Sequence, residues 1–369
     1  MFKSLILIPI DIYDINGTSH NAIKIIKAMH TCHWQVSVFN YFAAKHLLVD
    51  YEINDDLIIS VNEQLQIPAR ELPENFTDKV KIINELNQLL NKKINFFDYD
   101  LIVDMTAFQP IGLMHLPNYI FVQQYQPSWY TTSEFYCHGF ANPLLEASNL
   151  VLYDQYQLHH YDPKKHYFFA PLSVYDKKTI LNCLHEYEAN AMQKYHGDIV
   201  YIGRINQQEK NIGLIDNLNR YYNANIQVYG PLEESLDLVN YHGKLTRQQV
   251  FSQLEQSKYA ILVSNTEGFS YSLVEAISTG TPVIIRNSFP AAKFLTSQHN
   301  GFLFAKNATN AELSELLKKI MHLSFAQYDE LVHNNFQFAL ARLSTETFNQ
   351  NWKIILNYFT KSGVYCYQQ

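Results

Sequence analysis

One feature of the sequence limits its possible folds most strongly: short apolar runs alternate with longer stretches that have helical periodicity. Such alternation is typical of parallel strands joined by crossover helices. A first series of runs covers Leu5–Ile10, Gln35–Phe39, Leu101–Asp104, Tyr119–Gln123, Leu150–Tyr153 and Tyr167–Ala170. A second series covers Ile199–Ile202, Ile226–Tyr229, Leu238–His242, Ala260–Val263, Pro282–Ile285 and Gly301–Phe304. The sequence therefore predicts an α/β protein with two doubly wound, Rossmann-like sheets.

The two series also predict the domain organisation. A polar, helix-like stretch ending at Gly197 separates them, so we expect one domain over residues 1–190 and a second over 191–345. The length of 369 residues agrees with two domains. Residues 346–369 begin with apolar residues at helical spacing, which predicts a terminal helix that crosses back to the N-terminal domain. Ligands of open α/β sheets bind at the carboxyl ends of the strands, so we expect the site in a cleft between the domains.

Composition and charge exclude several classes of function. The 28 basic and 35 acidic residues give a net charge of −7, which argues against binding a nucleic acid. No stretch approaches the roughly 18 uninterrupted apolar residues of a membrane span, so we expect at most peripheral membrane contact. The four cysteines show no CxxC spacing, which indicates neither a zinc site nor a disulfide framework. A cytoplasmic protein fits these observations best.

The segment ILVSNTEGFSYSLVEAISTGTPVII, residues 261–285, carries the clearest chemistry. A strand leads into a loop that holds Glu267 and Gly268, and a helix is predicted to begin near Ser270. Gly268 lets the backbone approach a ligand closely, and the first N–H groups of the helix point toward an anion. These N–H groups belong to Ser270, Tyr271, Ser272 and Leu273. We therefore predict a phosphate site at this turn.

Two carboxylates flank that predicted phosphate site. Glu267 and Glu275 stand eight positions apart, and the intervening loop lets both face one pocket. A deep carboxylate accepts hydrogen bonds from a ribose diol, and one beside the phosphate meets hydroxyls of the group that the phosphate carries. The alternative is structural: Glu275 as a surface charge and Glu267 as a partner of the helix dipole.

The stretch EGFSYSLVEAISTGTPV resembles the E-x7-E element of the retaining GT-B glycosyltransferases of family 4. VYIGRINQQEKN, residues 200–211, is similar to the element that begins their nucleotide-binding domain. The resemblance implies a GT-B fold and transfer of a sugar from a nucleoside diphosphate donor to an acceptor hydroxyl. It implies catalytic roles for Glu267, Arg204 and Lys210, with the two cations neutralising the departing diphosphate without a metal. No other cofactor is expected, and the acceptor is a glycan, a lipid-linked glycan or a protein.

The resemblance also extends the donor site to other segments. VYGPLEES, residues 228–235, and the segment after it place the base near Gly230 and Leu245. In the N-terminal half, Gly17 stands where the family has paired glycines before the first helix. The implied donor-binding set is Gly17, Gly230, Leu245, Gly268, Phe269, Ser270, Tyr271, Ser272, Leu273 and Glu275.

The main departure from the family follows the fourth strand. Many members have a histidine there, whereas this chain reads YIFVQQYQPSWY, with Gln124 and Tyr125 as candidate contacts to the sugar or acceptor. Glutamine bonds to a hydroxyl but takes no proton. An alternative is therefore a non-catalytic GT-B protein that binds a partner glycosyltransferase or a glycosylated acceptor. A weaker alternative is an epimerase or phosphorylase of the same architecture.

Overall fold

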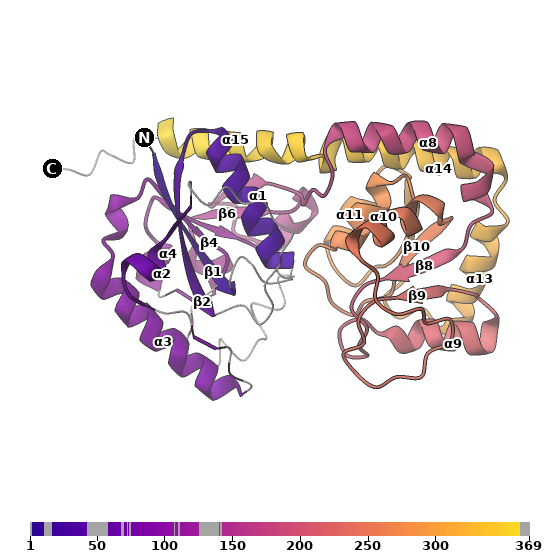
Figure 1. Cartoon of the computed structure of the whole chain (residues 1–369), viewed down its shortest axis with the longest axis horizontal. Coiled ribbons are helices and arrows are strands. Elements are labelled where there is room, and N and C mark those ends of the chain that lie inside the picture. The colour runs from indigo at the N-terminus through magenta and orange to yellow at the C-terminus, as the bar shows by residue number, and fades with distance from the viewer. Residues whose placement is uncertain are drawn as a thin grey trace. The chain divides into compact units, whose positions relative to one another are not determined.

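The computed structural model describes residues 2–10, 17–42, 58–67, 70–71, 73, 75–106, 108–109, 111–124, 140 and 142–361. The chain forms two compact units, each built on its own parallel sheet (Figure 1). The first unit comprises Met1–Tyr153, Leu158–Ala170 and Asn349–Gln369, and the second comprises Asp154–Gln157 and Pro171–Phe348. The predicted α/β class with two parallel Rossmann-like sheets is confirmed.

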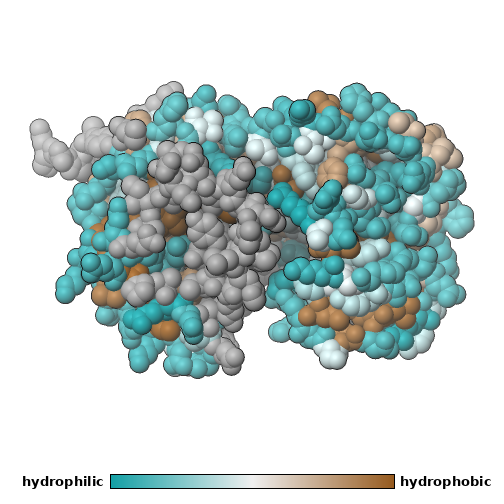
Figure 2. All heavy atoms as spheres, in the orientation of Figure 1, coloured by the Kyte–Doolittle hydropathy of each residue, from teal (hydrophilic) through white to brown (hydrophobic). Residues whose placement is uncertain are grey.

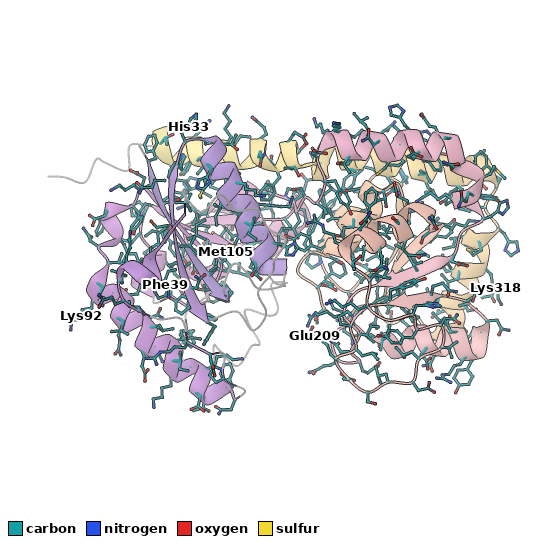
Figure 3. All side chains as sticks on the ribbon, viewed as in Figure 1. His33, Phe39, Lys92, Met105, Glu209 and Lys318 are labelled. Atoms are coloured by element: carbon teal, nitrogen blue, oxygen red, sulfur yellow. The ribbon has the colours of Figure 1, made fainter. Side chains whose placement is uncertain are left out.

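The first unit contains a seven-stranded parallel sheet in the order β3-β2-β1-β4-β5-β6-β7. Its strands are β1 (Lys3–Ile10), β2 (Gln35–Phe42), β3 (Ile58–Ser60), β4 (Leu101–Asp104), β5 (Tyr119–Val122), β6 (Asn149–Leu152) and β7 (His166–Phe169). All but β3 correspond to predicted runs, and β3 is an edge strand too short to stand out as an apolar run. The sheet forms the core of the unit: Phe39 and Met105 lie inside it, whereas Lys92 lies at the surface (Figure 3).

The N-terminal half also contains helices of very different length. They are α1 (Gly17–Thr31), α2 (Val61–Gln64), α3 (Phe76–Lys93), η2 (Phe96–Asp98), α4 (Ile111–Met114), α7 (Pro143–Glu146) and η3 (Gln155–His160). The α3 helix shows why such segments form. Its N-cap Asn75 accepts a hydrogen bond of 2.8 Å from the Asp78 N–H, and Ile83, Leu86 and Leu90 bury one face.

The second unit contains a five-stranded parallel sheet in the order β12-β11-β10-β8-β9. Its strands are β8 (Ile199–Ile202), β9 (Gln227–Tyr229), β10 (Tyr259–Leu262), β11 (Val283–Arg286) and β12 (Gly301–Phe304). Its helices are α8 (Lys177–Tyr195), α9 (Ile212–Tyr222), α10 (Arg247–Gln256), α11 (Tyr271–Ser278), α12 (Ala291–Leu295), α13 (Asn310–Met321), α14 (Phe325–Phe338) and the π-helical η4 (Ala339–Leu343). On the face shown in Figure 2, the described surface is mostly hydrophilic.

The strand predicted over Leu238–His242 is wrong. Only an isolated bridge between Val228 and Tyr241 forms there. The backbone is left-handed at Asn240 (φ 60°), inside the predicted run, and again at Gly243 (φ 86°), so the extended conformation is interrupted at Asn240. Apolar side chains alone do not reveal these turns, because a short apolar run fits a strand and an irregular segment equally well.

The N-terminal boundary of the second unit also differs from the expected position. A boundary after residue 190 falls inside α8, whereas the long continuous segment of the second unit begins at Pro171. The α8 helix packs within the second unit: the Tyr187 hydroxyl donates to Asp329 at 2.7 Å. The buried Lys194 ammonium donates to the Leu254 carbonyl at 2.8 Å and the Thr281 hydroxyl at 2.8 Å. It thereby joins α8 to the end of α10 and to the turn after α11.

The last helix, α15 (Thr345–Lys361), matches the predicted terminal helix in position. Its Tyr358 ring packs against Phe168 of β7, with 5.2 Å between ring centroids. Phe359 lies near the same Phe168 ring, and Trp352 is buried. In the part of the chain that the structure describes, no helix has the length and apolar character of a membrane span.

Candidate functional site

The start of α11 provides a group of backbone donors after β10. Helices α10, α13 and α14 begin with capping boxes, in which a hydroxyl accepts a hydrogen bond from the first turn. Ser270, the N-cap of α11, makes no such bond, and its hydroxyl lies 3.0 Å from that of Ser272. The predicted helix start is confirmed, and its first turn has no side-chain cap to compete with an anion.

Buried side chains hold this turn in place. Phe269 and Leu273 are 4% and 2% exposed. The Phe269 ring lies 6.0 Å from that of Phe294 on α12. Gly268 and Ser270 flank Phe269 in the loop. The anchored ring therefore fixes the position of the backbone that precedes the helix.

Lys210 and Glu267 form an ion pair that links the loop after β8 to the loop after β10. Their side chains are only 12% and 13% exposed. The Ser264 hydroxyl also donates to Glu267, at 3.0 Å, and the Lys210 N–H donates to Asn206 Oδ1 at 3.0 Å. The structure thus brings together two predicted site residues that are far apart in sequence.

Arg204 lies in the same loop after β8 but in a different environment. Its guanidinium donates to Glu209 at 2.8 Å and to Glu233 at 3.0 Å, and its side chain is 54% exposed. Asn206 Nδ2 donates to the second oxygen of Glu233 at 2.5 Å. Figure 3 labels Glu209 on this loop. Two cations and three carboxylates therefore occupy the region where the donor phosphates were predicted.

Glu275 occupies the second turn of α11 and is half-buried. Burial raises the pKa of its carboxyl to about 7, while the Arg247 guanidinium acts in the opposite direction. Among the described residues, no donor forms a hydrogen bond or ion pair with this carboxylate. A carboxyl with a raised pKa and no hydrogen-bond donor is typical of a group that binds a ligand.

Gly230 makes a close backbone contact, and its partner is protein. Its φ is 146°, and a Cβ there would lie 1.7 Å from the Gly203 carbonyl oxygen. The Gly230 N–H donates to the Gly243 carbonyl at 2.9 Å. Leu245, two residues further, is half-buried. Gly230 is therefore required for the packing of the loops after β8 and β9, and its contact with a base stays a prediction.

The predicted residues of the first unit are described only in part. Gly17 is the first residue of α1, as expected for a turn that opens a helix. Gln124 follows β5, is 9% exposed and donates to the Val122 carbonyl at 3.2 Å. Tyr125 lies outside the described residues. The sugar or acceptor contacts of these residues stay predictions.

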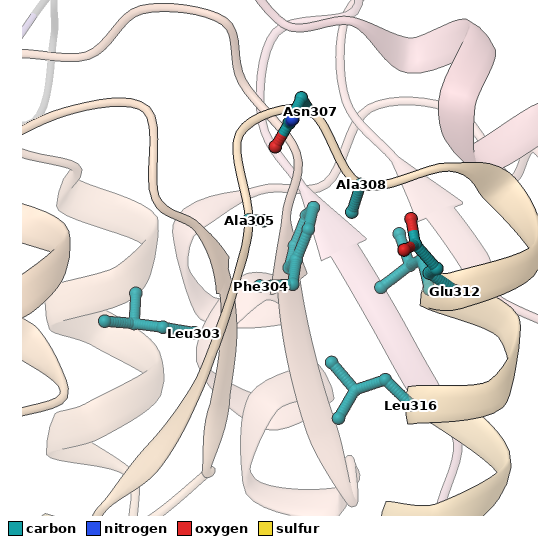
Figure 4. Close-up of a pocket in the computed structure, with 8 residues that line it drawn as sticks. Leu303, Phe304, Ala305, Asn307, Ala308, Glu312 and Leu316 are labelled. Carbon is teal, nitrogen blue, oxygen red and sulfur yellow. The ribbon is translucent and has the colours of Figure 1, made fainter.

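A pocket of about 260 Å³ lies between the end of β12 and the start of α13 (Figure 4). Most of its lining residues are apolar, and its one carboxylate, Glu312, accepts hydrogen bonds from the Thr309 N–H at 2.8 Å and the Thr309 hydroxyl at 2.9 Å. That carboxylate is therefore committed to the cap of α13. We assign this pocket no ligand.

Sequence reasoning missed the residues that surround the predicted cations. Glu209 and Glu233 stand within the quoted motifs, yet nothing in the motifs shows that their side chains turn toward Arg204. Ser264 and Asn206 are also absent from the prediction, although a polar side chain at a strand end is a signal for such a role. Among the described residues, no cluster of three or more His, Cys, Asp or Glu side chains could hold a metal ion.

Comparison with known proteins finds a family similarity in the second unit. Residues 197–337 match the family model of glycosyl transferases group 1. A search of curated protein sequences finds no match. The family match covers the second unit from β8 to α14 and therefore includes both loops of the candidate site.

Solved structures resemble the whole chain. Sucrose-phosphate synthase from Thermosynechococcus elongatus is 11% identical, with a TM-score of 0.73, covering 98% of this chain and 100% of the other. WaaG, a glycosyltransferase of lipopolysaccharide biosynthesis, is 11% identical, with a TM-score of 0.64 and coverage of 97% and 100%. Anabaena HepE in complex with UDP and glucose is 15% identical, with a TM-score of 0.64 and the same coverage. These likenesses show the GT-B fold.

Proposed function

We propose that this protein is a retaining, metal-independent glycosyltransferase that binds a nucleoside diphosphate sugar at the start of α11. One observation carries the proposal: a helix start without a side-chain cap lies between the Lys210–Glu267 pair and the unpartnered carboxylate of Glu275. Backbone donors for phosphate, a cation and an acceptor for hydroxyls are the groups that a nucleotide sugar requires. UDP, the nucleotide named for the Anabaena neighbour, is the first nucleotide to test.

The diphosphate accepts hydrogen bonds from the first turn of α11 and is neutralised by Arg204 and Lys210. Both cations already have carboxylate partners, so the donor competes with Glu209 and Glu233 for Arg204 and with Glu267 for Lys210. The exposed Arg204 pairs are weak and exchange readily with a phosphate, which carries more charge. Lys210, held by a nearly buried partner, supplies fixed positive charge where the leaving group forms.

The two glutamates have separate roles in this proposal. Glu275 accepts hydrogen bonds from the ribose hydroxyls, which gives its carboxylate the partners that it lacks in the donor-free protein. Glu267, next to Lys210 and the helix start, accepts hydrogen bonds from hydroxyls of the transferred sugar. The first role serves every nucleotide, and the second serves only a nucleotide that carries a sugar.

In the reaction the acceptor hydroxyl oxygen forms a bond to the anomeric carbon of the sugar. The bond from that carbon to the phosphate oxygen breaks, and its electron pair leaves with the nucleoside diphosphate. The acceptor proton passes to a phosphate oxygen of the donor. Attack and departure on the same face of the sugar retain the anomeric configuration, and the acceptor is a glycan, a lipid-linked glycan or a protein.

The test begins with a panel of nucleotide sugars, read by nucleoside diphosphate release and by the anomeric NMR signals of the product in excess EDTA. We expect release from one donor and a product with the anomeric configuration of that donor. An inverted product refutes the retaining mechanism. Loss of activity in EDTA with recovery in Mg²⁺ or Mn²⁺ refutes metal independence.

A second candidate function is a non-catalytic GT-B protein that supports a partner glycosyltransferase or binds a glycosylated acceptor. The pairing of Arg204 with two carboxylates and the glutamine at position 124 favour it. This candidate predicts that nucleotides bind without turnover of any donor in the panel. Turnover by the isolated chain excludes it.

A further inference from the structure

Tyr175 lies directly before α8, in the segment that follows β7. Its ring packs edge-on against Phe251 of α10, with 5.2 Å between centroids and an angle of 84° between ring planes. Its carbonyl accepts a hydrogen bond of 3.0 Å from the Thr345 N–H. The ring and the backbone of Tyr175 are therefore both held in place within the second unit.

The hydroxyl of Tyr175 is buried and has no hydrogen-bond partner among the described residues. Most buried hydroxyls in folded proteins are paired, because an unpaired one loses its hydrogen bonds to water without replacement. Tyr195, close by in sequence, shows the usual situation: its hydroxyl donates to the Leu323 carbonyl at 2.7 Å. The unpaired hydroxyl of Tyr175 therefore needs an explanation.

The surroundings of that hydroxyl point to the candidate donor site. Burial raises the pKa of Tyr175, and the Glu275 carboxylate raises it further, whereas the Arg247 guanidinium lowers it. Arg247 and Phe251 belong to α10, which packs against α11, the helix of Glu275. The Glu275 carboxylate thus acts electrostatically on the Tyr175 hydroxyl, yet no hydrogen bond joins the two groups.

We propose that Tyr175 is a further donor-binding residue, whose hydroxyl forms a hydrogen bond with the same ribose diol that Glu275 accepts from. The inference rests on the proposed function and adds to it a residue that lies outside every sequence motif quoted for the donor site. Ribose hydroxyls both donate and accept, so one diol satisfies the phenol and the carboxylate together. The Tyr175 hydroxyl forms no hydrogen bond with Glu275 or with any other described residue.

This assignment predicts opposite effects of one substitution on stability and on affinity. Tyr175→Phe removes an unpaired polar atom from the donor-free protein, so its melting temperature rises by about 2 to 4 °C. The same substitution removes a hydrogen bond from the complex, so the Kd for UDP rises about 3- to 10-fold. A residue with only a structural role shows no such divergence.

The experiment compares wild type, Tyr175→Phe and the control Tyr195→Phe by calorimetric titration and thermal unfolding. UDP, 2′-deoxy-UDP and 3′-deoxy-UDP are the probes. In Tyr195→Phe we expect a lower melting temperature and an unchanged Kd, because its hydroxyl is paired within the protein. In Tyr175→Phe we expect weaker binding of UDP and a much smaller loss of affinity for one of the deoxy nucleotides.

The experiment distinguishes failure of the Tyr175 assignment from failure of the proposed function. If Glu275→Gln weakens UDP binding while Tyr175→Phe binds UDP as tightly as wild type, the Tyr175 assignment is wrong and the donor site stands. An equal loss of affinity for UDP and both deoxy nucleotides also overturns the assignment, because it shows that the lost hydrogen bond does not involve a ribose hydroxyl. If wild type binds neither UDP nor any other nucleoside diphosphate, the proposed function fails and the assignment fails with it.

Discussion

Replacing Lys210 by methionine tests how firmly the donor loops are held by charge. The substitution keeps the length of the side chain and removes the ammonium that pairs with Glu267. The Glu267 carboxylate then retains only the Ser264 hydroxyl, at 3.0 Å, as a donor among the described residues. Lys210→Met should therefore destabilise the donor-free protein, because it leaves a nearly buried charge without its counter-charge.

The exposure of the Lys210–Glu267 ion pair determines how much stability its loss should cost. Breaking a buried ion pair costs about 3 to 5 kcal/mol, and exposed pairs contribute about 0 to 1 kcal/mol. The two side chains are 12% and 13% exposed, which places them near the lower end of the buried range, at about 3 kcal/mol. For a unit of this size the loss lowers the melting temperature by about 6 to 12 °C.

A double-mutant cycle with Glu267→Gln supplies the control. The glutamine keeps an oxygen for Ser264 and removes the charge, so Lys210→Met/Glu267→Gln should recover at least about half of the stability lost in Lys210→Met. Urea and thermal unfolding at pH 7 give the four free energies of unfolding. Additive single effects, each below about 1 kcal/mol, would refute the argument, because they would show that solvent already screens the pair.

Three further predictions follow from the same loops and helices. Arg204→Ala should lower turnover by about 10² to 10³ while changing the free energy of unfolding by less than about 1 kcal/mol, and near-normal turnover would contradict the role of Arg204. Glu209→Gln should tighten nucleoside diphosphate binding about 2- to 5-fold at low salt, and weaker binding would contradict the same role. The raised pKa of Glu275 should make the protein without nucleotide less stable as pH rises from about 4.5 to 7, since the folded state binds the extra proton. It should also make nucleotide affinity fall up to tenfold per pH unit below 7. Glu275→Gln should flatten both pH profiles, and unchanged profiles in that variant would assign them to another group. Lys194→Met should lower the free energy of unfolding by about 3 kcal/mol, since the Glu255 and Thr279 carbonyls and the Thr281 hydroxyl lose the hydrogen bonds that the buried Lys194 donates to them. Urea unfolding indistinguishable from wild type would show that water replaces these hydrogen bonds.

The order of strands and helices could be predicted from sequence because buried parallel strands produce runs that periodicity detects directly. β8 and β10 coincide with their predicted runs to within one residue. β3 and the Leu238–His242 segment could not be predicted, because the first is only three residues long and the second is shaped by left-handed turns at Asn240 and Gly243. The predicted boundary fell inside α8, because a polar helix packed on its domain looks like a linker in sequence.

The candidate site could be predicted as a set of residue types but not as a network. The sequence predicted the α11 start and the glycine before it, since both follow from strand, loop and helix order. It could not predict that Lys210 pairs with Glu267 or that Arg204 faces Glu209 and Glu233, because these contacts join loops that are distant in sequence. The unpaired hydroxyl of Tyr175 depends on the packing of α10 and leaves no sequence signal.

The most direct test of the account is the affinity of two variants for two ligands, measured by calorimetric titration. The ligands are a nucleotide sugar that the panel identifies as a donor and the nucleoside diphosphate released from it. Glu275→Gln should lower the affinity for both ligands by the same factor, because the ribose is common to them. Glu267→Gln should leave the affinity for the nucleoside diphosphate nearly as in wild type and lower only the affinity for the nucleotide sugar. Equal losses for both ligands in both variants would contradict the division of roles on which the proposed donor site rests.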